Sequence, residues 1–167
     1  MRNIIITGAS RGLGFETARI FAKDRQNRVF AIARNEVGLR KLLQTCRSDN
    51  GSDNLIIFPF DLEKGDYENV LIPAILDKMD KIDVLVNNAG LLINKPFEMM
   101  EVEDFDRIFT ANVRSAFSLV KGLYFNFAAN SHILNIGSMG GFQGSAKFPG
   151  LSLYSASKGA LAVLTEC

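Results

Sequence analysis

The sequence predicts an α/β fold, a doubly wound parallel sheet with helices on both faces. Short apolar runs rich in β-branched residues alternate along the chain with longer segments whose apolar residues recur at helical spacing. The runs are apolar at nearly every position, which is typical of strands that are covered on both faces. A glycine-rich turn joins the first run to the first helical segment.

The alternation assigns the elements in order. Strands are expected at residues 3–7, 28–33, 55–60, 82–86 and 132–137. Helices are expected at residues 13–23, 37–46, 67–79, 103–126 and 154–166. Residues 48–54 and 140–149 are predicted to be loops because small, polar and turn-forming residues cluster there. No linker divides the chain, so residues 1–167 are expected to form a single domain.

Composition and charge narrow the classes of partner. Nineteen Lys and Arg face eighteen Asp and Glu without forming a basic stripe, so neither nucleic acid nor an anionic membrane surface is an expected partner. Cys46 and Cys167 lie far apart without metal-ligand spacing, so we expect no metal site and no disulfide framework. No apolar stretch is long enough to span a bilayer and no signal peptide is visible, so the cytoplasm is the expected location.

The turn after the first strand reads Thr7-Gly8-Ala9-Ser10-Arg11-Gly12-Leu13-Gly14. Glycines allow a sharp turn and close approach of the backbone to a pyrophosphate, and the amides at the start of the next helix attract its negative charge. A glycine turn without a ligand is the alternative, but the position after the first strand favours a nucleotide site. No Lys-Ser/Thr pair follows the last glycine, which excludes a P-loop. The candidate phosphate-binding residues are Gly8, Ser10, Arg11, Gly12, Leu13 and Gly14.

Three further motifs follow in order. Asn87-Asn88-Ala89-Gly90 closes the fourth strand, Asn112 lies in the long helix, and Ser138 ends the fifth strand before Tyr154-Ser155-Ala156-Ser157-Lys158. This series resembles the short-chain dehydrogenase/reductase family over the whole chain. The resemblance implies a Rossmann-like domain that binds a nicotinamide cofactor, with Asn88, Ala89 and Gly90 beside it. It also implies an oxidoreductase that acts on small-molecule carbonyl or alcohol substrates.

The end of the second strand indicates which cofactor is bound. An NAD site usually places an acid there, whereas this chain has Arg34 and no carboxylate before Glu36. Arg34 can fork onto a 2′-phosphate and Arg11 can approach it from the glycine turn, so NADP(H) is predicted. The alternative is that each arginine is only a solvated surface residue. Asp61 and Leu62 resemble the family's adenine-contacting pair, although Asp61 is equally well explained as a helix cap.

Tyr154 and Lys158 are the candidate acid/base pair. Four residues apart on a helix, they face the same side. The ordinary pKa of tyrosine, near 10, is too high for an efficient base, and a fixed cation favours the phenolate. Ser138 is placed to donate a hydrogen bond to the substrate oxygen. The resemblance adds that Lys158 bonds the nicotinamide ribose and that Asn112 holds a water that links Lys158 to solvent. A core tyrosine, a surface lysine and a strand-end serine are the alternatives.

The chain departs from the family pattern in two places. Ser138 and Tyr154 are 154 − 138 = 16 positions apart, a few more than is usual in the family. The family continues to a sixth and a seventh strand, so the fold is expected to be truncated after the helix at residues 154–166, without about two βαβ units and the substrate lid. A non-catalytic NADP(H)-binding or interaction protein of the same fold is therefore the alternative function. By resemblance, the long helix and the Tyr154 helix are expected to pair in a homodimer or homotetramer.

Overall fold

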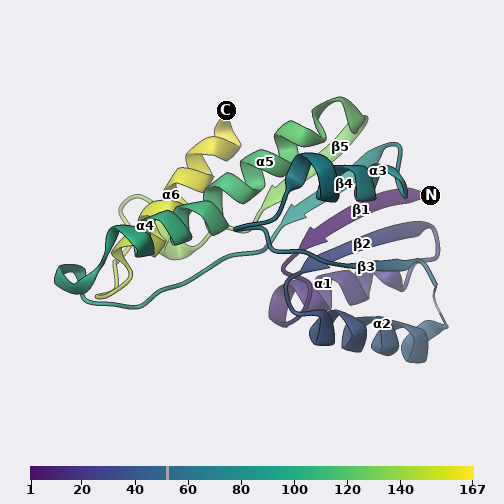
Figure 1. Cartoon of the computed structure of the whole chain (residues 1–167), viewed down its shortest axis with the longest axis horizontal. Coiled ribbons are helices and arrows are strands. Elements are labelled where there is room, and N and C mark those ends of the chain that lie inside the picture. The colour runs from purple at the N-terminus through teal and green to yellow at the C-terminus, as the bar shows by residue number, and fades with distance from the viewer. Residues whose placement is uncertain (52) are drawn as a thin grey trace.

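The sheet has five parallel strands in the order β3-β2-β1-β4-β5, as the computed structural model shows for residues 1–51 and 53–167 (Figure 1). The strands are β1 (Arg2–Thr7), β2 (Asn27–Ala33), β3 (Leu55–Pro59), β4 (Ile82–Asn87) and β5 (Phe127–Asn135). The chain winds outward from β1 to β3 and then returns to place β4 on the other side of β1. Ligands of such sheets bind at the carboxyl ends of the strands beside this reversal.

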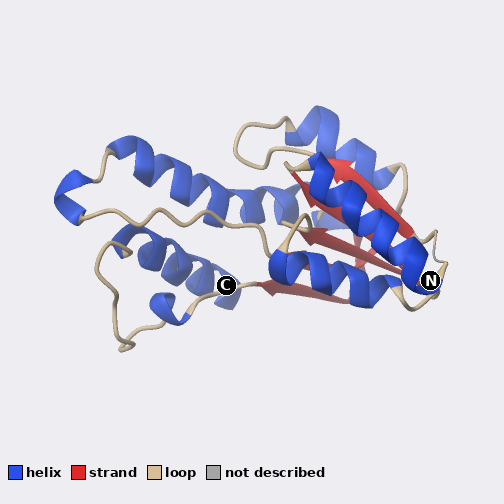
Figure 2. Ribbon diagram, turned by 90° about the horizontal axis from the view of Figure 1, so that it is seen from below, coloured by secondary structure: helices blue, strands red, loops and turns tan. Residues whose placement is uncertain are grey.

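Helices cover both faces of the sheet, which confirms the predicted doubly wound fold (Figures 1 and 2). Ile4 and Ile6 of β1 pack into one apolar cluster with α1 (Gly12–Ala22) and α2 (Glu36–Asn50). Ile5 points to the other face, where the cluster includes residues of α3 (Ile72–Leu76) and α5 (Ser115–Gly122). Every residue of β1 after Arg2 is buried, as expected for a strand covered on both faces.

Two more helices extend beyond the carboxyl ends of the strands (Figures 1 and 2). They are α4 (Val102–Phe109) and α6 (Ser152–Glu166), and they contact each other. Residues 88–101 lead away from β4 to the start of α4 (Figure 2). Both helices therefore lie beyond the carboxyl edge of the sheet, which is also the edge where the glycine turn lies.

The predicted loop at residues 48–54 is wrong at its start, because α2 continues to Asn50. Gly51, with φ of +62°, ends the helix in the left-handed conformation that glycine adopts readily. The last turn of α2 is polar, so its composition resembled that of a loop. The remainder of that prediction includes residue 52, which lies outside the described residues.

Two predicted helices are interrupted by π-helical turns. Residues 67–79 form a π-helical turn at Tyr67–Leu71 followed by α3, which ends at Leu76. Residues 103–126 form α4, a second π-helical turn at Thr110–Arg114, α5 and a short 3₁₀ turn. A π-helical turn adds a residue to the helix locally and is frequent at functional sites.

The fifth strand begins five residues earlier and ends two residues earlier than predicted. Its pairing with β4 is irregular, since Ile82 pairs with Phe127 whereas Val84 pairs with His132. Regular pairing therefore starts at His132, where the sequence indicated the strand. β5 is an edge of the sheet, and Ile133 and Leu134 on it are exposed.

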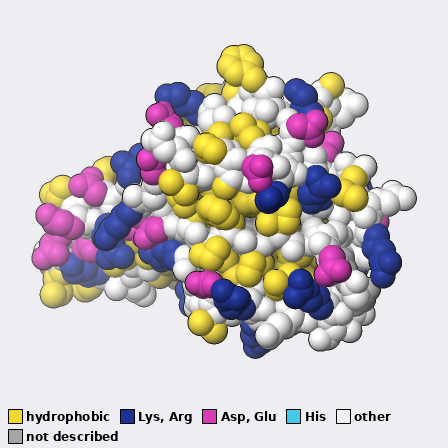
Figure 3. Space-filling view, turned by 45° about the vertical axis from the view of Figure 1, so that its right-hand side comes forward, with side chains coloured by type: hydrophobic (Ala, Val, Ile, Leu, Met, Phe, Trp, Pro, Cys, Tyr) yellow, Lys and Arg dark blue, Asp and Glu magenta, His cyan; other side chains and the backbone are white. Residues whose placement is uncertain are grey.

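The surface mixes charges of both signs around a central group of hydrophobic side chains on the face shown in Figure 3. Within residues 1–51 and 53–167, no helix is both long and apolar enough to cross a membrane. The same residues contain no group of three or more His, Cys, Asp or Glu side chains that could hold a metal ion. Cys46 is buried and Cys167 is exposed, and neither forms a disulfide.

Candidate functional site

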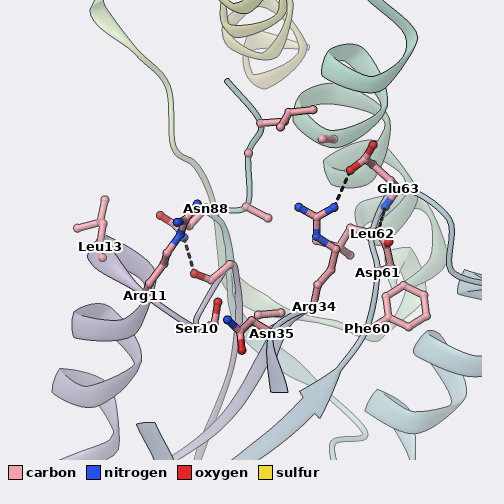
Figure 4. A pocket seen from close by; sticks show the side chains of 17 residues that line it. Ser10, Arg11, Leu13, Arg34, Asn35, Phe60, Asp61, Leu62, Glu63 and Asn88 are labelled. Carbon is pink, nitrogen blue, oxygen red and sulfur yellow. Dashed lines mark hydrogen bonds and ion pairs between the residues drawn. The ribbon is translucent and has the colours of Figure 1, made fainter. Parts of the chain in front are cut away.

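A cavity of about 530 Å³ lies at the carboxyl edge of the sheet, beside β1 and β4 (Figure 4). The glycine turn, the ends of β2 and β3 and the segment after β4 line it. Eleven of the predicted cofactor residues are in its wall, namely Gly8, Ser10, Arg11, Gly12, Leu13, Arg34, Asp61, Leu62, Asn88, Ala89 and Gly90. The structure therefore brings together four segments that the sequence keeps far apart. Gly14, Tyr154 and Lys158 are not in this wall.

The glycine turn requires glycine at specific positions. Gly8 and Gly12 have φ of +69° and +58°, in the left-handed region that side chains disfavour. A Cβ at Gly14 would lie 2.5 Å from the carbonyl oxygen of Gly8, too close for two non-bonded atoms. Gly14 therefore lets α1 begin directly beneath the turn.

Two side chains fix the turn against the end of β4. The Thr7 hydroxyl oxygen accepts hydrogen bonds from the backbone N–H groups of Asn88 and Ala89, both at 3.0 Å. The Asn88 side-chain amide donates to the carbonyl oxygens of Thr7 at 2.9 Å and Gly8 at 3.3 Å. Thr7 was not among the predicted site residues. Its hydroxyl at the end of an otherwise apolar strand was the signal that could have identified it.

The opposite side of the cavity is formed after β2 and β3. Asp61 Oδ1 accepts the backbone N–H of Glu63 at 2.8 Å, so Asp61 both lines the cavity and caps its own turn. The Tyr67 hydroxyl donates to the carbonyl of Leu62 at 2.8 Å and holds this turn in place. Burial raises the pKa of Tyr67, which keeps that hydroxyl protonated. The role of Tyr67 in fixing the turn after β3 was not predicted from the sequence.

The two arginines of the cavity differ in their partners. Arg34 Nη1 lies 2.9 Å from Glu63 Oε2, and this ion pair lies on the same side of the cavity as Asp61 and Leu62 (Figure 4). Within the described part of the chain, no ion pair or hydrogen bond engages the side chain of Arg11. Glu63 is a cavity residue that the sequence analysis did not identify.

Lys158 is buried at the junction of α6 with the sheet. Only 4% of the residue is exposed, and its ammonium group donates to the carbonyl oxygen of Ile136 at 2.6 Å. Burial lowers the pKa of Lys158, because a desolvated ammonium is less stable than a solvated one. A Cβ on Gly90 would lie 3.6 Å from Lys158 Nζ, so Lys158 reaches the segment that lines the cavity.

Asn112 lies in the π-helical turn and is 2% exposed. Its amide donates to the Leu91 carbonyl at 3.0 Å and to Ser157 Oγ at 2.9 Å, and its Oδ1 accepts from Leu91 N–H at 2.7 Å. Both donors of the side-chain amide are thus engaged with protein atoms. The bond from Asn112 to Ser157 ties the π-helical turn to α6, and within that helix Ser157 donates to the Tyr154 carbonyl at 2.7 Å.

Ser138 directly precedes a short 3₁₀ turn, Met139–Gly141, and a loop then leads to α6, which carries Tyr154. Ser138 Oγ accepts the N–H of Gly140 at 3.2 Å and caps that turn. A Cβ on Gly140 would lie 2.9 Å from Ser155 Oγ, so the turn packs directly on α6. Tyr154 is half-buried in the first turn of α6. Asn112, Ser138, Tyr154 and Lys158 therefore lie on elements that contact one another.

Comparison with known proteins identifies the family. The family model described as short chain dehydrogenase matches residues 2–167. The chain belongs to this family. Among its relatives, "Ketoacyl reductase HetN" of Nostoc sp. is 34% identical over 167 residues, covering 99% of this chain and 56% of the relative. "Carbonyl reductase [NADPH] 2" of Sus scrofa is 32% identical, covering 97% of this chain and 62% of the relative.

A solved structure supports the fold in three dimensions. The 3-ketoacyl-(acyl-carrier-protein) reductase of Brucella melitensis, complexed with NADH, superposes with a TM-score of 0.85 at 30% identity. The match covers 99% of this chain and 67% of that protein. The chain spans 56% of the length of one of the curated relatives that it matches and 64% of the length of another.

Proposed function

We propose that this protein is an oxidoreductase that transfers hydride between NADP(H) and a carbonyl or alcohol substrate. The observation that carries the proposal is that one cavity is lined by the glycine turn, by Arg34 and by Gly90, which lies beside Lys158. We assign the cofactor to the predicted residues of the cavity wall, with Gly14 beneath the turn and with Tyr154 and Lys158 beyond it. The comparisons offer no support for the alternative of a non-catalytic binding protein.

The residues present fit a dinucleotide carrying a 2′-phosphate. The left-handed glycines and the N-terminus of α1 suit a pyrophosphate, because exposed amides and the helix dipole attract its charge. Arg11 and Arg34 supply cations on the adenosine side, and no carboxylate ends β2. Relatives differ here, since one name specifies NADPH and one structure holds NADH. The choice of NADP(H) therefore depends on these two arginines.

The chemistry divides between the cofactor and the protein. The bound nicotinamide supplies or accepts the hydride. In the reducing direction, the Tyr154 hydroxyl gives its proton to the substrate oxygen as that oxygen gains negative charge. Ser138 donates a hydrogen bond to the same oxygen, and the ammonium of Lys158 favours the resulting phenolate. Asn112 positions the Tyr154 helix through Ser157, and we keep its role in a water relay as part of the proposal.

The cellular location and the oligomeric state of the protein are part of the same proposal. We place the protein in the cytoplasm as a homodimer or homotetramer, without a nucleic-acid or membrane partner. Apolar side chains that are exposed on α5 and α6 support self-association, namely Phe117, Val163 and Leu164.

Titration of the purified protein with NADPH and NADH tests the cofactor assignment. We expect NADPH to bind at least about tenfold more tightly, which is the scale of one charge-assisted hydrogen bond to phosphate. Arg34→Gln should remove most of that preference by weakening NADPH alone. Arg47→Gln is the matched control, because Arg47 is an exposed arginine that pairs with Asp53 at the far end of α2. Equal affinities in the wild type would overturn the assignment to NADP(H).

A further inference from the structure

Glu63 is a negatively charged residue in the wall of the cavity to which we assign a negatively charged ligand. Only 9% of its side chain is exposed, and it lines the same cavity as Arg11 and Arg34 (Figure 4). Its backbone is fixed on both sides, since its N–H donates to Asp61 Oδ1 at 2.8 Å and its carbonyl accepts Arg114 Nη2 at 3.3 Å. The carboxylate is therefore held in place beside the cation that we assign to the 2′-phosphate.

Two arginines share this carboxylate. Arg34, from the end of β2, binds Oε2 at 2.9 Å, and Arg107, from α4, lies 3.4 Å from Oε1. Both arginine side chains are more than half exposed, whereas the Glu63 side chain between them is nearly buried. A nearly buried carboxylate is costly unless it is paired, so Glu63 needs at least one of these partners. If Arg34 binds another anion, Arg107 remains beside Glu63 as that partner.

We propose that Glu63 competes with the 2′-phosphate of the cofactor for Arg34 and so sets how strongly the protein prefers NADP(H) over NAD(H). A carboxylate and a phosphate bind a guanidinium through the same donors, and they repel each other at close range. Glu63 thus weakens the binding of a 2′-phosphate, while Arg107 limits that effect by sharing the carboxylate. The inference rests on the proposed binding of NADP(H) in this cavity. Glu63 acts through Arg34 as a positioning residue.

The first test is the ratio of the NADH and NADPH dissociation constants in Glu63→Gln. We expect NADPH to bind roughly threefold to tenfold more tightly than in wild type and NADH to change little, the range of a partly exposed ion pair plus the relieved repulsion. Glu16→Gln is the matched control, since Glu16 is an exposed carboxylate paired with Arg19 outside the cavity wall. It makes the same charge change and should leave the ratio unaltered. Thermal unfolding of each variant checks that the fold is retained.

Arg107→Gln provides the second test. Without Arg107 the carboxylate depends on Arg34 alone, so NADPH should bind less tightly while NADH is unaffected. In Glu63→Gln/Arg107→Gln the effect of removing Arg107 should disappear, because no carboxylate remains to hold Arg34. A loss of NADPH affinity that persists in the double variant would show that Arg107 acts on the phosphate directly, and would overturn the inference.

The outcomes separate the inference from the proposed function. Equal binding of NADPH and NADH by the wild type contradicts the assignment to NADP(H), whichever way the variants behave. A wild type that prefers NADPH, together with an unchanged ratio in Glu63→Gln, contradicts only the competition between Glu63 and the phosphate. Tighter NADPH binding by Glu63→Gln, with no change in Glu16→Gln, supports both.

Discussion

At the scale of single residues, Lys158 combines a cost in stability with a role in the proposed chemistry. The residue is buried, and its ammonium donates to the carbonyl oxygen of Ile136. Burial lowers the pKa of Lys158 below its ordinary value, so the folded state holds this proton less strongly than the unfolded chain. A cation placed in this way is an unfavourable choice for packing alone. Its position beside Gly90 and Asn112 is consistent with selection for function.

The pH dependence of stability tests this view of Lys158. Between its lowered folded-state pKa and about 10.5, the unfolded chain binds more protons, so the contribution of Lys158 to the free energy of unfolding rises with pH. Lys158→Met removes that contribution. We therefore expect the stability of the wild type relative to Lys158→Met to increase from pH 7 toward pH 10.5 in denaturant titrations. A difference that stays constant over this range would show that burial does not shift the pKa of Lys158.

Residue chemistry in the cavity could be predicted only in part. Arg34 was visible because it stands where a strand-end acid is usual, and the structure places it in the cavity wall. Its partner Glu63 was not visible, because twenty-nine residues separate them and only the pairing of β2 with β3 brings them together. The same holds for Ser157, whose contact with Asn112 joins residues forty-five positions apart.

At the scale of elements, the strands were the most predictable part of the fold. A strand that is buried on both faces must be apolar at nearly every position, so β1 and β2 are evident from composition alone. The π-helical turn that carries Asn112 was not predictable, because one extra residue in a turn leaves the apolar spacing of a long helix almost unchanged. The start of β5 was missed because its first residue pairs out of register with the rest.

The turn from β1 to α1 is the element whose geometry is most tightly constrained. Gly14→Ala would place a Cβ within 2.5 Å of the Gly8 carbonyl, so the turn must open. We expect this variant to lose about 1–3 kcal/mol in the free energy of unfolding, the usual cost of overpacking, and to lose most of its NADPH affinity. Gly137→Ala is the control for stability, because a Cβ there meets no atom within 4 Å. Unchanged stability and cofactor binding in Gly14→Ala would contradict the close packing of this turn.

At the scale of the whole molecule, the reversal of strand order beside β1 determines where the chemistry lies. It brings the glycine turn, the end of β4 and the contacts of α6 to one edge of the sheet. The order of the motifs along the sequence predicted this meeting, since parallel strands present their carboxyl ends to the same edge. The helices α5 and α6 also leave apolar side chains exposed, among them Phe117, Val163 and Leu164. These side chains form the surface that we assign to self-association.

In the proposed function, Tyr154 is the proton donor in an NADPH-dependent reduction. NADPH consumption by wild type and Tyr154→Phe, measured with a panel of aldehydes, ketones and 3-oxoacyl thioesters, tests it most directly. We expect the wild type to reduce at least one compound. We expect Tyr154→Phe to lose about 100-fold or more in turnover, the scale of general acid catalysis, and still to bind NADPH within about twofold of the wild-type affinity. Turnover retained by Tyr154→Phe, or a wild type that binds NADPH and reduces nothing in the panel, would contradict it.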